Sequence, residues 1–316
     1  MIARVLCFAL LVFAAVPSRW ASPPVALALG VAFGVVVAHP YAGAARRASR
    51  TLLQVSVVAL GFGMNLEQVL RVGRSGFVYT LGGIAFALTM GTVLGRVLGV
   101  RGKTAFLVSV GTAICGGSAI AAVGPAVEAS DDEMSVSIGT VFVLNAVGLL
   151  VFPPLGHLLA LREPQFGLWA ALAIHDTSSV VGAGAKYGPV ALTVATTVKL
   201  ARALWIVPLT LASAAVHARR TGHAKKSAIK WPWFILFFLG AAVVSTYAKP
   251  LAPVFPWLSA AGRAGLTVTL FLIGTGMSRE SLRQVGARPL VHGVSLWIVV
   301  ASVSLALVRA RWAAIP

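Results

Sequence analysis

Long apolar runs separated by short polar loops make up almost the whole chain. Many of these runs approach the ~20 residues that an α-helix needs to cross the hydrocarbon core of a bilayer. The pattern predicts about eleven spanning helices, at residues 2–16, 24–39, 51–66, 76–98, 104–127, 134–160, 166–186, 190–216, 231–248, 260–277 and 289–309. Several runs are short or rich in Gly and Pro, as broken or tilted helices are, so ten or twelve spans remain alternatives.

The composition supports an all-α, polytopic membrane protein. Hydrophobic residues fill 58% of the 316 positions and charged residues only 11%, whereas soluble domains carry about 25% charged residues. No polar stretch between the apolar runs is long enough to fold alone. We therefore expect residues 1–316 to form a single transmembrane domain.

Residues 1–22 allow two interpretations. Arg4, an apolar run and the small residues after it also occur in cleaved signal peptides. We favour a retained first helix, because multispanning proteins rarely need a cleaved signal and residues 17–20, PSRW, make a poor cleavage site.

The excess of basic residues indicates topology. The chain has 26 Lys and Arg residues against 8 Asp and Glu residues, but the cations cluster in short loops between apolar runs, so no nucleic-acid partner is expected. The positive-inside rule places the densest basic loop, residues 219–230, in the cytoplasm. The N-terminus is then inside and the C-terminus outside, with sixteen basic loop residues inside and eight outside. The acidic loop at residues 128–133 falls outside in this topology.

An internal repeat indicates an inverted architecture. The sequence LGFGMNLE at residues 60–67 recurs as IGTGMSRE at residues 273–280, and the match continues to Gly73 and Gly286. We take residues 51–74 and 264–287 as repeat-related segments. The two copies end the third and the tenth span, which cross the membrane in opposite directions. Inverted repeats of this kind hold the substrate near the membrane midplane, between the halves.

A glycine-rich sequence, GTAICGGSAI at residues 111–120, interrupts the fifth span. Paired glycines favour a break in the helix. A half-helix restarting there would point free N–H groups and its positive dipole end at the midplane, which suits an anion. Close packing of helices through small residues is the alternative. The candidate binding residues are Cys115, Gly116, Gly117 and Ser118, of which Cys115 is expected to be a packing residue.

The seventh span contains His175 and Asp176 at its centre. Asp176 is the only acidic residue inside a predicted span, and an ionisable residue there is a functional candidate. Its carboxylate is expected to carry a proton, to bind a cation or to neutralise one of the intramembrane cations. The His175 imidazole either titrates near neutrality or serves as a packing residue.

Hydroxyl and amide side chains accompany these two residues. Thr177, Ser178 and Ser179 either bind the substrate or bond to their own helix backbone. Asn145, in the sixth span, is expected to orient one of the broken helices or to bridge two helices.

Lys199 and Arg202 lie near the centre of the eighth span, with about ten uncharged residues on either side. A charge there costs roughly 2.5–3.5 kcal/mol and usually faces a bundle interior, a partner or a substrate path. Their spacing puts both on one face of a helix. We expect them to supply positive charge to an anionic substrate.

Enzymatic chemistry is not expected. The sequence contains no Gly-x-Ser-x-Gly motif, no phosphate-binding loop and no His cluster with metal-ligand spacing. Cys7 and Cys115 both lie in apolar segments, which argues against a disulfide framework. We therefore expect no metal and no other cofactor.

Three segments carry a resemblance to a known family: GTAICGGSAIAA at 111–122, AIHDTSSVVGA at 173–183 and VKLAR at 198–202. They resemble the YeiH family of bacterial inner-membrane proteins, which is named for sulfate export. The resemblance extends over nearly the whole chain from about residue 20, and it implies a multi-pass transporter of the bacterial inner membrane. In the topology above the two broken spans run parallel, so either one of them is re-entrant or they are not repeat partners.

These observations together predict a secondary transporter of a small inorganic or sulfonated anion. Two intramembrane cations against one acid favour an anionic substrate, and Asp176, His175 and Asn145 would couple its transport to a proton or to sodium. One alternative is a cation/proton antiporter in which Asp176 is the carrier. Another is a channel or sensor that does not transport. A homo-oligomer remains open.

Overall fold

The computed structural model describes residues 23–36, 42–221, 233–276 and 286–310, and these ranges contain helices and connections but no strand. The all-α prediction is therefore confirmed. Within the described ranges, five helices are long and apolar enough to cross a membrane: Thr80–Val97, Asp132–Leu158, Pro189–Arg219, Phe255–Thr275 and Ala287–Arg309. Shorter apolar helices accompany them, so the predicted number of eleven spans is not confirmed.

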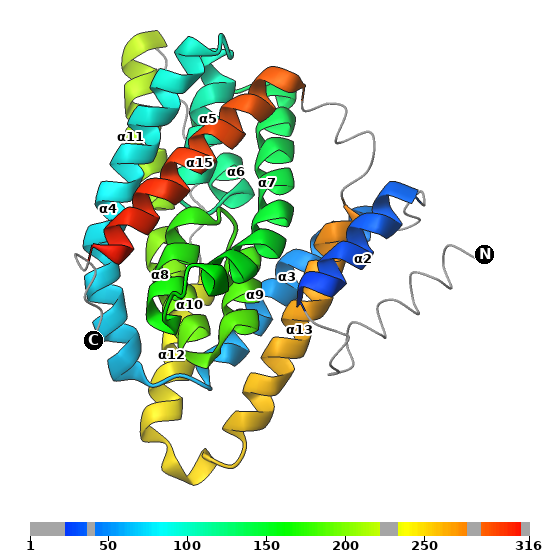
Figure 1. Cartoon of the computed structure of the whole chain (residues 1–316), viewed down its shortest axis with the longest axis vertical. Coiled ribbons are helices and arrows are strands. Elements are labelled where there is room, and N and C mark those ends of the chain that lie inside the picture. Colours follow the sequence, from blue (N-terminus) through cyan, green and yellow to red (C-terminus); the bar gives the residue numbers. More distant parts are fainter. Residues whose placement is uncertain (1–22, 37–41, 222–232, 277–285, 311–316) are drawn as a thin grey trace.

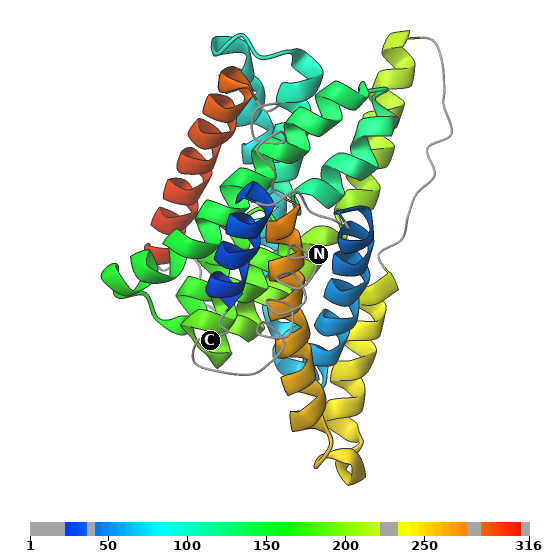
Figure 2. The same cartoon turned by 90° about the vertical axis from the view of Figure 1, so that its right-hand side faces the viewer.

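One group of helices contains α2 (Pro23–Val36), α3 (Ala42–Gly61), α12 (Trp233–Tyr247) and α13 (Phe255–Thr275). The short 3₁₀ turn η1 (Lys249–Leu251) joins the last two, at the bottom of Figure 2. Helix α13 packs against both α2 and α3. Glycines permit the close approach of α13 to α2. A β-carbon on Gly274 would lie 2.6 Å from the Leu27 carbonyl oxygen, which is too close for any side chain.

The larger group surrounds the centre of the molecule (Figure 1). Its long helices are α4 (Leu66–Val97), α7 (Asp131–Leu158), α10 (Pro189–Ala203) continued by α11 (Ile206–Thr221), and α15 (Ala287–Arg309). Between them lie four short helices: α5 (Gly102–Ala113), α6 (Gly117–Ala126), α8 (Glu163–Ala173) and α9 (Thr177–Tyr187).

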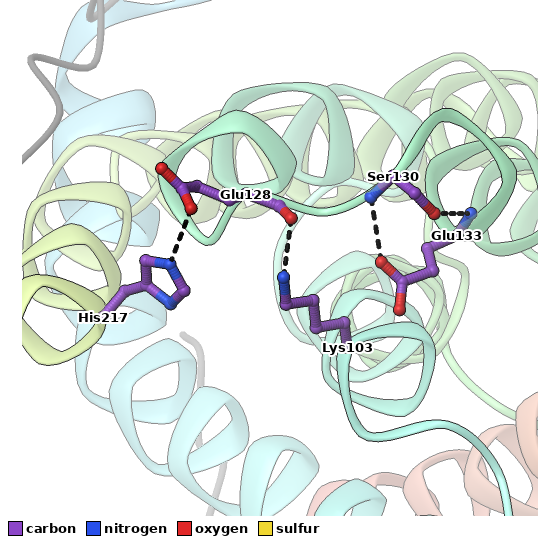
Figure 3. A network of polar contacts seen from close by, with 5 residues as sticks. All are labelled: Lys103, Glu128, Ser130, Glu133 and His217. Carbon is purple, nitrogen blue, oxygen red and sulfur yellow. Dashed lines mark hydrogen bonds and ion pairs between the residues drawn. The ribbon is translucent and has the colours of Figure 1, made fainter. Parts of the chain in front are cut away.

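Helices α5 and α6 form a hairpin, which we call the first hairpin (residues 102–126). The Lys103 ammonium, in the first turn of α5, donates a 2.6 Å hydrogen bond to the Glu128 carbonyl, just beyond the end of α6 (Figure 3). The chain therefore returns to the end from which it entered. It leaves into α7, which begins with a capping box: the Ser130 hydroxyl accepts the Glu133 N–H, and the Glu133 carboxylate accepts the Ser130 N–H.

Helices α8 and α9 form the second hairpin (residues 163–187). The Glu163 carboxylate, in the first turn of α8, accepts the N–H groups of Val190 and Ala191 at 2.7 and 3.1 Å, directly after the end of α9. The rings of Phe166 and Tyr187 stack between the two helices with centroids 3.7 Å apart. This hairpin points toward the first one from the opposite end of the molecule (Figures 1 and 2).

The prediction that residues 104–127 and 166–186 cross the membrane is wrong, because both segments turn back at their midpoints. This finding also corrects the expected topology. The acidic loop at residues 128–133, which was expected outside, lies at the same end as Lys103. By the same reasoning Arg162 moves from the inside to the outside. The predicted sixteen basic residues inside and eight outside therefore become fifteen inside and nine outside. Two re-entrant segments cancel in the span count, so they do not alter the predicted sides of the termini, which stay a prediction.

The sequence repeat is compatible with the described helices. Gly63, just beyond the end of α3, lies beside Ser259 in the first turns of α13, and Gly262 lies beside Ser56, so α3 and α13 run antiparallel. That is the relation an inverted repeat requires. Residues 277–285 of the second copy lie outside the described residues, so the repeat itself stays a prediction.

The hairpins predict which exposed positions share a side of the membrane. With Cys7 and Cys115 replaced by Ser, cysteines introduced at Arg101 and Asp132 should react with a membrane-impermeant maleimide from one side, because both flank the first hairpin. Cysteines at Arg162 and Lys186 should react together from the other side. Labelling of Arg101 and Asp132 positions from opposite sides would contradict the re-entrant hairpin and restore the spanning helix.

Candidate functional site

The tips of the two hairpins meet in the middle of the larger helix group. Gly116, at the first tip, has φ +68°, a left-handed conformation that favours glycine. A β-carbon there would lie 3.5 Å from the Asp176 α-carbon and 3.5 Å from Asn145 Nδ2. The non-helical residues 114–116 and 174–176 therefore contact each other beside Asn145 of α7, and the breaks expected at both motifs are confirmed.

The carbonyl groups that end α5 all have hydrogen-bond donors. Ile114 N–H donates to the Val110 oxygen and Gly116 N–H to the Gly111 oxygen, at 3.1 and 2.8 Å. The next two carbonyls receive the guanidinium of Arg202: Nη2 donates to Thr112 at 3.3 Å, and Nε donates to Ala113.

The end of α8 is completed in the same way by three side chains. Arg202 Nη1 donates to the carbonyls of Leu172 and Ala171 at 2.7 and 3.3 Å. Lys199 Nζ donates to Ile174 at 2.8 Å and to Ala171 at 3.4 Å. The indole N–H of Trp297, on α15, donates to the remaining carbonyl, that of Ala173, at 3.0 Å.

Lys199 and Arg202 therefore cap the negative ends of both half-helices. Their side chains are 0% and 1% exposed, and a helix C-terminus carries roughly half a negative charge, which stabilises a cation. Arg202 reaches both hairpins, whereas Lys199 reaches only the second. No salt bridge joins either cation to Asp176 in the part of the chain that the structure describes.

Asp176 caps the positive end of the second hairpin. Its Oδ2 accepts the N–H groups of Ser178 and Ser179 at 3.0 and 3.3 Å, and also the Ser178 hydroxyl. The Asp176 N–H in turn donates to Asn145 Oδ1 at 2.9 Å. Thr177, Ser178 and Ser179 are buried, so the first turn of α9 is held by its own acid and by α7.

The positive end of the first hairpin has no such cap. The N-cap of α6 is Gly116, which has no side chain to accept the first N–H groups. Gly117 is half-buried and Ser118 is exposed. Beside this end lies Asn145 Nδ2, which is buried and makes no hydrogen bond within the described residues. The start of α6 and the Asn145 amide nitrogen thus place hydrogen-bond donors close to each other.

His175 lies within the second tip, between Ile174 and Asp176. Its ring is 1% exposed, and neither ring nitrogen has a hydrogen-bond partner among the described residues. Its ring lies beside that of Trp297, with centroids 6.4 Å apart. Cys115, at the first tip, is a buried free thiol, as expected for a packing residue.

The structure thus brings the predicted residues to one junction. Those assigned to the substrate or to coupling are Cys115, Gly116, Gly117, Ser118, Asn145, His175, Asp176, Thr177, Ser178, Ser179, Lys199 and Arg202. Their individual roles stay predictions. Sequence reasoning missed the carbonyl groups of α5 and α8, whose identity no side chain reveals, and Trp297. A tryptophan inside a span was the available signal, because a buried indole N–H needs an acceptor.

Removing the Arg202 guanidinium should destabilise the protein. In Arg202→Met, the carbonyls of Thr112, Ala113 and Leu172 lose their donors, at about 1–3 kcal/mol for each unsatisfied group. We expect a clear drop in melting temperature of the purified protein in detergent, and a smaller drop for Arg202→Lys, which keeps the charge. Lys186→Met, at an exposed cation, is the matched control and should not change it. An unchanged melting temperature in Arg202→Met would contradict the capping role.

Comparison with known proteins places the chain among bacterial membrane proteins. A family profile described as Conserved hypothetical protein 698 matches residues 2–293. The UPF0324 membrane protein of Bdellovibrio bacteriovorus is 48% identical over 317 residues, covering 98% of this chain and 93% of its own length. That of Porphyromonas gingivalis is 50% identical over 296 residues, covering 92% and 88%. No solved structure matches the chain.

Proposed function

We propose that this protein, which belongs to the UPF0324 family of membrane proteins, is a secondary transporter of a small inorganic or sulfonated anion. Family membership confirms the resemblance carried by the three central segments and the expectation of a membrane protein. The substrate, the coupling ion, the bacterial inner membrane as location and the absence of enzymatic activity are parts of the proposal.

The meeting of two re-entrant hairpins supports transport. Non-helical backbone at membrane depth is tolerated only where it is buried in protein or lines a water-filled cavity. In transporters, such interrupted helices hold substrates and coupling ions near the midplane. The contacts between residues 114–116 and 174–176, with Asn145 beside them, fit that arrangement and support the proposal.

The open N-terminus of α6 is the observation that carries the choice of an anion. Helix N-termini bind anions through free N–H groups and a positive dipole end. The Asn145 amide adds a donor that lacks a partner in the described structure, and the exposed Ser118 adds a hydroxyl. An oxyanion offers enough acceptor oxygens to receive all of these donors.

Lys199 and Arg202 support the same choice without touching the substrate. Two cations face one acid, Asp176, at the junction, which leaves an excess positive charge in a medium of low dielectric constant. Their hydrogen bonds go to backbone carbonyls, so we assign them a long-range electrostatic effect on the anion. Sulfate, which the family resemblance implies, is the first anion to test.

The cation/proton antiporter is the second candidate. One observation favours it: the Asp176 side chain is only half-buried, although it caps α9. A carboxylate that stays accessible at the tip of a hairpin is able to exchange a proton for a cation. In the anion transporter the same carboxylate provides the coupling to a proton or to sodium.

Flux in proteoliposomes tests the proposed site through Asn145→Asp. This change keeps the Oδ1 acceptor for the Asp176 N–H but replaces the free donor with a carboxylate oxygen. We expect saturable flux of at least one anion, from a panel of sulfate, sulfonates and halides, in the wild type. A loss of about a hundredfold in the kcat/KM of Asn145→Asp should follow, since a donor is lost and a repulsive charge gained.

The matched control is Asn65→Asp, the same change at an exposed position of the loop before α4, where flux should stay at the wild-type level. Full anion flux in Asn145→Asp would contradict the anion site. Electroneutral sodium/proton exchange without movement of any anion in the wild type would favour the antiporter.

Asp176→Asn separates coupling from binding. Asparagine still accepts the N–H groups of Ser178 and Ser179, so the cap of α9 should persist. We expect anion binding to remain and the dependence of flux on pH or on sodium to disappear. A flux that keeps its wild-type dependence on both would show that Asp176 is only a helix cap.

A further inference from the structure

A cavity remote from the hairpin tips lies at the end of the molecule where the first hairpin begins. Its volume is ≈ 660 Å³, and it is bounded by the end of α4, the first turns of α5 and the last half of α11. Helix α10 packs against α4, whereas its continuation α11 packs against α6. The two long helices α4 and α11 therefore leave a wedge-shaped space between them.

The wedge has an apolar interior and a cationic rim. Its walls include Phe106, Val127, Leu209 and Val216, and its rim carries Arg96 and Lys103. A hydrated inorganic anion would gain nothing from the apolar walls, whereas a hydrocarbon chain would fill the space between them with van der Waals contacts. The combination suits a molecule with an apolar tail and an anionic head.

The cations of the rim remain available to a ligand. Arg96 is exposed, and its guanidinium makes no hydrogen bond or ion pair with the residues that the structure describes. The Lys103 ammonium uses one donor for the Glu128 carbonyl and has two others. The nearby Glu128 carboxylate lies 3.5 Å from His217 Nε2, on the α11 side of the wedge (Figure 3).

We propose that this wedge binds an anionic phospholipid, with an acyl chain between α4 and α11 and the phosphate beside Arg96 and Lys103. The location suits such a lipid. The wedge lies at the end of α11 that leads into the basic loop at residues 219–230, and the positive-inside rule places that loop at the cytoplasmic leaflet. Anionic lipids of that leaflet attract basic residues near the surface.

Bound at this position, the lipid would stabilise the base of the first hairpin. Lys103 links the start of α5 to the end of α6, and Arg96 ends the helix that precedes them. A phosphate between these two cations would relieve their repulsion and fix the ends of the hairpin. The role is separate from transport of the anion at the tips and does not depend on it.

Native mass spectrometry of the purified full chain tests the site. We would titrate phosphatidylglycerol and, as the neutral comparison, phosphatidylcholine of the same acyl composition. Phosphatidylglycerol should bind more tightly to the wild type, and Arg96→Gln should weaken it about fivefold. Ala212→Phe, which fills the wedge from α11, should reduce binding of both lipids.

The matched control is Arg101→Gln, which removes the same charge five residues away, at an exposed position that does not line the wedge. Melting temperatures of all variants in phosphatidylcholine would check that each is folded. Equal losses in Arg96→Gln and Arg101→Gln would overturn the proposal in favour of unspecific attraction to the basic surface. Undiminished binding by Ala212→Phe, displacement of the lipid by millimolar inorganic phosphate, or a lipid-free dimer that buries the wedge would also overturn it.

Discussion

Carbonyl groups that end a helix have no partner within that helix, and the interior of a membrane has no water to supply one. Two hairpins that turn at mid-depth therefore create carbonyl groups that must be satisfied by side chains. Lys199 and Arg202 do this for both hairpins, with Trp297 completing the second. The cost of burying the two cations is offset by these bonds and by the negative ends of the half-helices. The position of each tip therefore depends on these contacts.

The N-termini of the half-helices α9 and α6, which are their positive ends, are capped differently. Asp176 caps α9 from within the chain, whereas α6 begins at a glycine and keeps its first N–H groups free. Asn145 contacts both tips: its Oδ1 accepts the Asp176 N–H of the second tip, and its Nδ2 lies beside Gly116 of the first. This asymmetry leaves hydrogen-bond donors without acceptors at the first tip, and the proposed anion site rests on those donors.

The sequence predicts much of this site and less of its topology. Gly116 and Asp176 mark the breaks, because a glycine pair and an acid are both costly inside a spanning helix. The two cations and Asn145 are recognisable by the same argument. The hairpins are not recognisable in the sequence, since an apolar stretch of about 24 residues satisfies a bilayer equally well as one span or as two halves. The direction in which the chain leaves Gly116 is set by tertiary contacts such as that between Lys103 and Glu128. The carbonyl partners of Arg202 are equally invisible, because every residue has one.

Hydrogen exchange at the two tips tests the central claim, that Arg202 holds both hairpins while Lys199 holds one. Exchange of peptides covering residues 112–120 and 172–180 would be compared among the wild type, Arg202→Met and Lys199→Met in detergent. The account predicts faster exchange at both tips in Arg202→Met and at the second tip alone in Lys199→Met. Unchanged exchange in both variants, or acceleration at a single tip in Arg202→Met, would contradict it.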